Sequence, residues 1–215
     1  NAIDTADVYS RWSPAGAGAS ETVIGAWLKA SGKRDKVVLA TKFGMEMSET
    51  EKGLSAKYMA AAVEASLMRL QTDHIDLYQA HRDDPDTPQE ESLEAFDRLV
   101  KAGKVRVIGA SNFEPARLKS ALEISAAKGL PRYESLQPLY NLSDRQGFEA
   151  GLQQLCVDEG VGVIPFYGLA SGFLTGKYRS EADFAKSARG GGMGKYLNDR
   201  GRAILTALDS VSAAH

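Results

Sequence analysis

The sequence has little that would support a disulfide framework, a membrane span or a polyanion-binding surface. Its single cysteine, Cys156, cannot form an internal disulfide, so we expect a reducing compartment, the cytoplasm. No apolar run approaches the roughly 20 residues that a membrane-spanning helix needs, and no signal peptide is visible. The net charge is only -2 at pH 7, which favours neither nucleic acid nor an anionic membrane surface as a partner.

The sequence also lacks the glycine fingerprint that marks a dinucleotide-binding open sheet. Its triple glycine, Gly190-Gly191-Gly192, lies in a long polar segment and not between a strand and a helix. What is present is a regular alternation of short apolar runs and helical patterns, repeated about every 30 residues without a linker. An open doubly wound sheet and a (β/α)8 barrel both fit this alternation, and the missing fingerprint favours the barrel.

Six strand-helix units can be counted. The predicted strands are residues 3, 37–40, 75–80, 105–110, 135–137 and 161–166, the first of them truncated at its start. The predicted helices carry apolar residues at helical spacing, with caps at Ser20 and Ser55 and a capping box over 87–90. A helix through 148–156, a long loop over 167–196 and a last amphipathic helix follow.

A complete barrel normally has eight units and about 250 residues. Six units and a start inside a strand lead us to expect a piece of a longer protein. We therefore predict that residues 1–215 belong to a single barrel domain without its N-terminal and C-terminal βα units.

Polar or aromatic side chains follow the predicted strands at their carboxyl ends. In strand order they are Asp4 with Tyr9, Lys42, His81, Ser111 with Asn112, Gln137, and Phe166 with Tyr167. Each has a structural alternative, such as a solvated Lys42 or a structural His81. Catalytic groups of barrels sit at this face, and recurrence in six consecutive units favours a shared site.

Four of these residues suggest proton transfer to a carbonyl oxygen. A free phenol has a pKa near 10, too high for an efficient acid at neutral pH, and a neighbouring ammonium group favours its phenolate form. Tyr9 and Lys42 supply this pair, Asp4 can hold the lysine, and His81 can orient a carbonyl. The carboxylates and the one histidine at these scattered strand ends lack metal-ligand spacing, so we expect no metal.

Several runs resemble the aldo-keto reductase family over essentially the whole chain. They begin with Asp4-Thr5-Ala6-Asp7-Val8-Tyr9 and Ala40-Thr41-Lys42, and continue with Ile75-Asp76-Leu77-Tyr78 and His81. Further matches are Ser20-Glu21 with Ile24-Gly25, Ile108-Gly109-Ala110-Ser111-Asn112-Phe113, Gln137 with Tyr140-Asn141, and Leu174-Thr175-Gly176-Lys177-Tyr178. Any one of these motifs alone is weak evidence for the family, but together they are specific to it.

The resemblance implies a (β/α)8 barrel that uses NAD(P)H to reduce aldehydes and ketones without a metal. It implies Tyr9 as general acid, Lys42 and Asp4 as its partners, and His81 as the group that orients the carbonyl. The implied cofactor-binding residues are Ser111, Asn112 and Gln137 for the carboxamide, Phe166 with Tyr167 beside the nicotinamide ring, and Leu169, Ser171 and Lys177 along the pyrophosphate. The implied substrate-pocket residues are Trp12, Phe43 and Arg82. NADPH is expected as the family default alone, with NADH as the alternative. In the family, the residues that bind the adenosine 2′-phosphate usually lie in the final βα unit, which is absent from this sequence.

Two other functions fit the same scaffold. Potassium-channel beta subunits are similar to aldo-keto reductases and act chiefly as partner subunits, so a non-catalytic or weakly catalytic binding role is the main alternative. A Schiff-base enzyme with Lys42 as nucleophile is another, but it needs a neutral lysine, and a nearby Asp4 opposes this.

Overall fold

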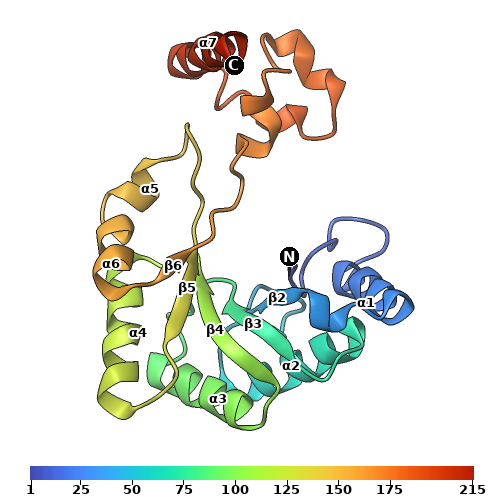
Figure 1. Ribbon diagram of the computed structural model, residues 1–215, viewed down its shortest axis with the longest axis vertical. Helices are drawn as coiled ribbons and strands as arrows, with labels where there is room; N and C mark the ends of the chain where they lie inside the picture. The colour runs from blue at the N-terminus through green and yellow to red at the C-terminus, as the bar shows by residue number, and fades with distance from the viewer. The chain divides into compact units, whose positions relative to one another are not determined.

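Six parallel strands form one sheet in which the spatial order equals the chain order. The computed structural model describes residues 1–215 and shows this sheet curled into a half-barrel (Figure 1). A doubly wound sheet would reverse its strand order at a switch point, so the consecutive order confirms the predicted barrel type of fold. The strands are β1 (Ala2–Asp4), β2 (Val38–Phe43), β3 (Ile75–Ala80), β4 (Val105–Ser111), β5 (Tyr133–Gln137) and β6 (Gly162–Val163).

The chain divides into two compact units. The first unit contains Asn1–Gln137 and Leu155–Val163, and so holds the whole sheet. The second unit contains Pro138–Gln154 and Ile164–His215. The single barrel domain predicted for the chain stays a prediction.

Helices cover the outer face of the sheet in the first unit. Consecutive helices pack against one another there, as Figure 1 shows. They are α1 (Ala19–Ser31), α2 (Ala56–Leu70), α3 (Gln89–Lys101) and α4 (Pro115–Lys128), with the short helix η1 (Arg34–Lys36) between α1 and β2. Because each of these connections returns over the same face, none of the four helices covers the opposite, inner face.

Two of the predicted helix caps are wrong. The hydroxyl of Thr87 donates to Asp84 (2.7 Å) and not to the start of α3, where Pro88 is the capping residue without a side-chain bond. Ser20 lies inside α1, which begins after Gly18, and its hydroxyl lies 2.8 Å from that of Thr5. The predicted Ser55 cap is confirmed.

Side chains alternate between the two faces of the sheet, as a pleated strand requires. In β2, Phe43 is fully buried on the outer side, where its ring stacks on Tyr78 (4.8 Å between centroids) and meets Phe96 of α3 edge-on. The preceding residue, Lys42, therefore points to the inner face. The alternation thus places the ring of Phe43 among the helices and the ammonium group of Lys42 on the inner face.

The strand predicted over 161–166 is shorter, and the helix predicted through 148–156 is divided. Only Gly162–Val163 pairs with β5, because Ile164 begins the second unit and Pro165 has no N–H for a ladder bond. The helix forms two pieces, α5 (Gln146–Glu149) and α6 (Leu152–Glu159), which are separated at Ala150-Gly151.

The segment predicted as a long loop folds around a small core of its own. It contains three short 3-10 helices, η2 (Ala170–Thr175), η3 (Glu181–Lys186) and η4 (Gly190–Gly192), followed by the predicted last helix, α7 (Asp199–Ala214). The core residues are Ala170, Phe173, Leu174, Tyr178, Met193, Tyr196 and Leu205. The apolar residues spaced along this Gly-rich segment thus belong to packing.

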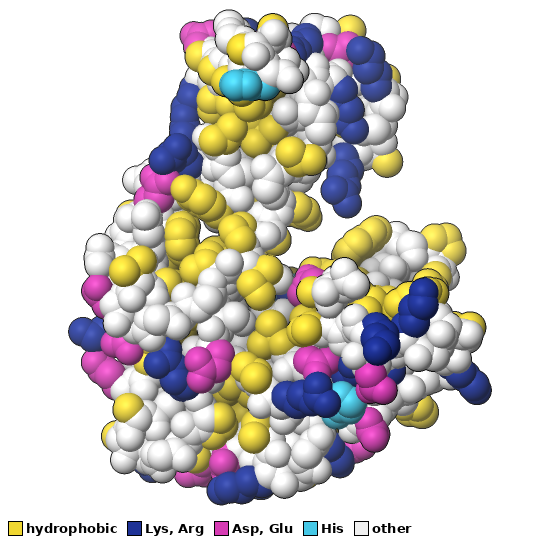
Figure 2. All heavy atoms as spheres, viewed as in Figure 1, with side chains coloured by type: hydrophobic (Ala, Val, Ile, Leu, Met, Phe, Trp, Pro, Cys, Tyr) yellow, Lys and Arg dark blue, Asp and Glu magenta, His cyan; other side chains and the backbone are white.

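The surface of the first unit mixes charges of both signs. Figure 2 shows Lys and Arg side chains interspersed with Asp and Glu on the face in view, without one broad basic area. None of the helices combines the length and the apolar character that crossing a lipid bilayer would require.

Candidate active site

The centre of the candidate site is the ammonium group of Lys42 at the carboxyl end of β2. This side chain is completely buried. Its nitrogen donates to Asp4 Oδ2 (2.7 Å), to the backbone oxygen of Thr5 (2.8 Å) and to the hydroxyl oxygen of Tyr9 (3.2 Å). The ammonium group is thus held by a carboxylate and a backbone oxygen, and its positive charge lies beside the hydroxyl group of Tyr9.

Asp4 ends β1, and Tyr9 lies in the turn that follows. Backbone bonds tie this turn to the end of β2: Thr5 N donates to Ala40 O and Asp7 N donates to Lys42 O, both at 3.0 Å. The phenol is therefore held by main-chain contacts as well as by its own bond to the lysine.

His81 follows β3 and meets the ring of Tyr9 edge-on, with 5.8 Å between ring centres. Its side chain is buried, and burial, assisted by the positive charge of Lys42, lowers its pKa from 6.5 to about 4. The imidazole is therefore neutral at physiological pH. A neutral imidazole beside a phenol can donate a hydrogen bond to an oxygen without adding charge to the site.

The three residues predicted to bind a carboxamide are linked to one another in the first unit. Ser111 Oγ donates to the backbone oxygen of Gln137 (2.8 Å), and Asn112 Nδ2 donates to Ser111 Oγ and to His81 O, both at 3.0 Å. Gln137 Nε2 donates to Asp4 Oδ1 (3.1 Å). A hydroxyl and two amides at the ends of neighbouring strands supply the donors and acceptors that a carboxamide requires.

The second unit brings together Tyr167, Leu169, Ser171 and Lys177, all predicted cofactor residues, around one cavity of about 650 Å³. Ser187 and Arg189 line the same cavity and were missed by the sequence interpretation, because they follow in a segment interpreted as a loop. Lys177 and Arg189 form no ion pair, and the hydroxyl-bearing residues Tyr167, Ser171 and Ser187 accompany them. This chemistry fits a phosphate-bearing ligand. Phe166 contacts the ring of Tyr167, with 5.3 Å between centroids.

The three residues predicted for the substrate pocket have different surroundings. Trp12 is 79% exposed, and Arg82 is exposed directly after His81. Phe43 belongs to the aromatic layer under the helices, as described above. The substrate role predicted for Phe43 conflicts with this position, because the pleat of β2 turns its ring away from the face that carries Lys42.

Two further residues around the cluster were not singled out from the sequence. Gln79 Nε2 donates to Asp4 Oδ1 (3.2 Å) from the inner face of β3. Its position two residues before His81 in a strand was the available signal. Asp7 is buried without a side-chain hydrogen bond, and burial, with the charge of Glu21, raises its pKa to about 7.

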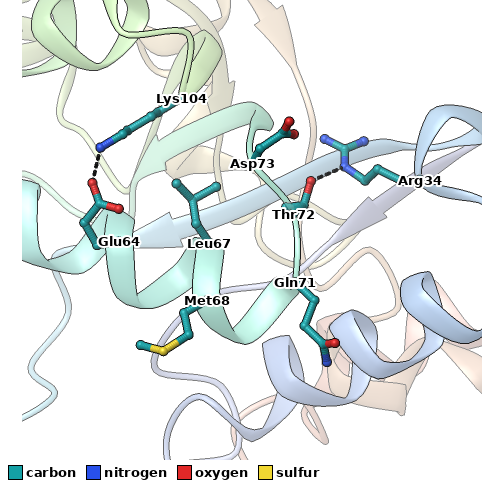
Figure 3. A pocket seen from close by; sticks show the side chains of 8 residues that line it. All are labelled: Arg34, Glu64, Leu67, Met68, Gln71, Thr72, Asp73 and Lys104. Atoms are coloured by element: carbon teal, nitrogen blue, oxygen red, sulfur yellow. Dashed lines mark hydrogen bonds and ion pairs between the residues drawn. The ribbon is translucent and has the colours of Figure 1, made fainter.

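A different hollow lies at the amino ends of the strands. Its lining includes Arg34 before β2, Asp73 before β3 and Lys104 before β4. Figure 3 shows that its two basic groups are already occupied: Arg34 donates to Thr72 (2.9 Å), and Lys104 pairs with Glu64. This hollow offers no free cation, and it lies at the end of the barrel opposite to the proton-transfer cluster.

Comparison with known proteins finds matches among the aldo-keto reductases. The model of the aldo/keto reductase family matches residues 1–214. Aldo-keto reductase YhdN of Bacillus subtilis is 34% identical over 211 residues, which are 97% of this chain and 60% of that protein. Aldo-keto reductase yakc [NADP(+)] of Schizosaccharomyces pombe is 35% identical over 84% of this chain and 52% of its own length.

A third relative is the L-glyceraldehyde 3-phosphate reductase of Escherichia coli K12, which is 36% identical over 147 residues, or 67% of this chain and 42% of the relative. The chain thus spans about half the length of the curated relatives it matches. The family model nevertheless covers nearly every residue from β1 to α7, and so the chain belongs to the aldo/keto reductase family.

Proposed function

We propose that this chain carries the catalytic face of an NAD(P)H-dependent reductase that converts an aldehyde or a ketone into an alcohol. The observation that carries the proposal is the buried Lys42, whose ammonium group contacts the carboxylate of Asp4 and the hydroxyl of Tyr9. Such a triad is the arrangement that a phenol needs in order to act as a proton donor near neutral pH.

In this proposal Tyr9 donates its proton to the carbonyl oxygen as that oxygen becomes negative. Lys42 stabilises the phenolate that remains, because its positive charge lies 3.2 Å from the phenol oxygen. Asp4 compensates the charge of the lysine and fixes its position. The same carboxylate opposes a neutral, nucleophilic Lys42, which argues against Schiff-base chemistry.

His81 orients the carbonyl group. Its pKa of about 4 keeps the imidazole neutral, so that one ring nitrogen can donate to the carbonyl oxygen while the proton comes from Tyr9. The edge-on contact between the two rings supports an arrangement in which both groups address the same oxygen.

The cofactor assignments rest on the polar groups described above. A bound nicotinamide cofactor would supply the hydride. Ser111, Asn112 and Gln137 would bind its carboxamide, Phe166 and Tyr167 would contact the ring, and Leu169, Ser171 and Lys177 would bind along the pyrophosphate. Arg189 joins this set through the cavity that it shares with Lys177. The printed name of the S. pombe relative, which specifies NADP(+), supports NADPH as the first cofactor to test.

Small aldehydes form the first substrate class to test, since the E. coli relative is named for one. Trp12 and Arg82 are proposed to contact the substrate. The oxidation of NADPH should be followed with a panel of aldehydes and ketones, with NADH as the alternative cofactor.

The decisive variant is Tyr9→Phe, which removes one hydroxyl group. It should lower kcat by roughly 100-fold to 10,000-fold, the usual contribution of a general acid, while cofactor affinity is retained. Tyr140→Phe is the matched control, because that hydroxyl donates to Glu149 (2.7 Å) in the second unit. Undiminished turnover in Tyr9→Phe would remove Tyr9 from the mechanism.

A further inference from the structure

The two oxygens of the Asp4 carboxylate have different partners. Oδ2 accepts the bond from Lys42 (2.7 Å), whereas Oδ1 accepts from two amides, those of Gln79 (3.2 Å) and Gln137 (3.1 Å). One oxygen therefore binds the cation, and the other is held by neutral donors from β3 and β5.

The Asp4 carboxylate is less enclosed than the ammonium group that it holds. The Asp4 side chain is 40% exposed, whereas its Lys42 partner is not exposed at all. A partly exposed carboxylate can occupy several staggered side-chain conformations unless both of its oxygens are held.

Gln79 is placed to restrict this freedom. It is fully buried, and its backbone is paired with that of Lys42 across β2 and β3, so that both side chains project from the inner face in one row. Its amide oxygen has no hydrogen-bond partner, and the bond to Asp4 is the one that its amide group makes. Burying an amide oxygen without a hydrogen-bond partner costs free energy. The contribution of the Gln79 side chain is therefore its hydrogen bond to Asp4.

We propose that Gln79 is a positioning residue that fixes the Asp4 carboxylate, and through it the ammonium group of Lys42 beside Tyr9. The inference rests on the proposed function and extends it by one residue. Gln137 makes a similar bond, but it is also proposed to bind the carboxamide of the cofactor. Gln79 has no second proposed role, so its side-chain amide serves as a hydrogen-bond donor to Asp4 alone.

The test compares Gln79→Met and Gln79→Glu in the full chain. Methionine keeps the length of the side chain and removes the donor. Glutamate keeps the shape but replaces the donor by a carboxylate, which competes with Tyr9 for the charge of Lys42. Ser135→Ala is the matched control, because this buried hydroxyl lies beside Gly109 next to Gln79 and has no partner.

The first readout needs neither cofactor nor substrate. The absorbance of tyrosinate is followed against pH in each variant, once with Tyr9 present and once with the additional substitution Tyr9→Phe. The difference between the two curves is the titration of Tyr9. The titration should move to higher pH in Gln79→Met and further in Gln79→Glu, because a less well-held ammonium group favours the phenolate less. Ser135→Ala should leave it unchanged.

The second readout is the pH profile of kcat, whose alkaline limb should move in the same order, with a loss of roughly tenfold at neutral pH. Wild-type midpoints in both Gln79 variants would overturn the inference even if the chain reduces carbonyls. Absence of turnover in the wild type would instead overturn the proposed function. If the two substitutions disturb only the packing, both will lower the thermal midpoint of unfolding, and the Tyr9 titration will not move further in Gln79→Glu than in Gln79→Met. That result would also overturn the inference.

Discussion

Tyr9 meets Lys42 with both its hydroxyl group and its ring. The ammonium nitrogen lies 3.2 Å from the phenol oxygen and 4.8 Å from the centre of the aromatic ring. Asp4 holds the same nitrogen at 2.7 Å. A cation that is fixed from two sides in a buried position loses little of its effect to solvent.

Lys42→Met should abolish most activity without unfolding the chain. The substitution leaves Asp4 partly exposed and still bonded to two amides, so no uncompensated buried charge results. We expect kcat to fall at least roughly 100-fold, because Tyr9 loses its cationic partner. Steady-state kinetics and thermal unfolding measure the two effects separately. Lys29→Met, at an exposed site on α1, is the control, and an active Lys42→Met would contradict the mechanism.

The rate should be insensitive to pH between about pH 5 and pH 7. A histidine with an ordinary pKa of 6.5 would titrate in this range, but burial lowers the pKa of His81 to about 4. Protonation of His81 therefore opposes folding, and its contribution to stability is lost as the pH falls from about 6.5 toward 4. His81→Leu should remove this acid-dependent loss and lower kcat. A kcat profile with an inflection near pH 6.5 that disappears in His81→Leu would show a protonated imidazole instead.

Asp7→Asn should stabilise the protein at alkaline pH. Between about pH 4 and pH 7 the unfolded chain releases this proton while the folded chain keeps it, so Asp7 lowers stability as the pH rises through this window. The difference between 3.8 and about 7, at roughly 1.4 kcal/mol for each pH unit, bounds the gain at about 4 kcal/mol.

Urea unfolding at pH 8 and at pH 4 measures this gain, which should vanish at the lower pH. Asp86→Asn, at an exposed position, should show no comparable dependence. An equal effect of Asp7→Asn at both pH values would mean that ionisation of Asp7 is not its cause.

Arg69→Met should destabilise the first unit strongly. Glu21 is fully buried and accepts from Arg69 Nε (2.7 Å) and from Thr41 Oγ1 (2.6 Å). Removing the arginine leaves a buried carboxylate with one neutral partner, which typically costs about 3 to 5 kcal/mol. Lys101→Met, which breaks an exposed pair with Asp97, should cost less than about 1 kcal/mol in the same unfolding experiment. Similar losses in the two variants would contradict the importance of burial.

Gly25→Ala should separate α1 from α2. A Cβ atom at this position would lie 2.1 Å from the backbone oxygen of Arg69, a contact that no side-chain rotation can relieve. Such overpacking typically costs about 1 to 3 kcal/mol. Gly147→Ala, where nothing lies within 4 Å of the added atom, should be neutral or slightly stabilising. The thermal midpoints of the two variants decide this prediction.

The repeating pattern of the fold could be predicted from the sequence because it is local. Apolar runs such as 75–80 are followed by helical periodicity. Gly32 ends a helix because glycine readily adopts the left-handed conformation of a helix end, which does not depend on distant contacts. The strand ends located Asp4, Lys42 and His81, because catalytic groups of barrels lie at the carboxyl ends of the strands. The cap predicted at Thr87 failed because its hydroxyl donates to Asp84, three residues earlier, and the substrate role implied for Phe43 conflicts with its contacts to Tyr78 and Phe96.

The sequence by itself thus determined the succession of strands and helices, the family and the residue types of the proton-transfer cluster. Only the tertiary structure decided which oxygen of Asp4 binds Lys42 and which one binds Gln79. It also decided that His81 is neutral and that Asp7 is buried without a partner. These properties depend on the distance between residues up to 133 positions apart, as in the bond from Gln137 to Asp4, and on how far each group is removed from water. Neither quantity is encoded in the order of neighbouring residues.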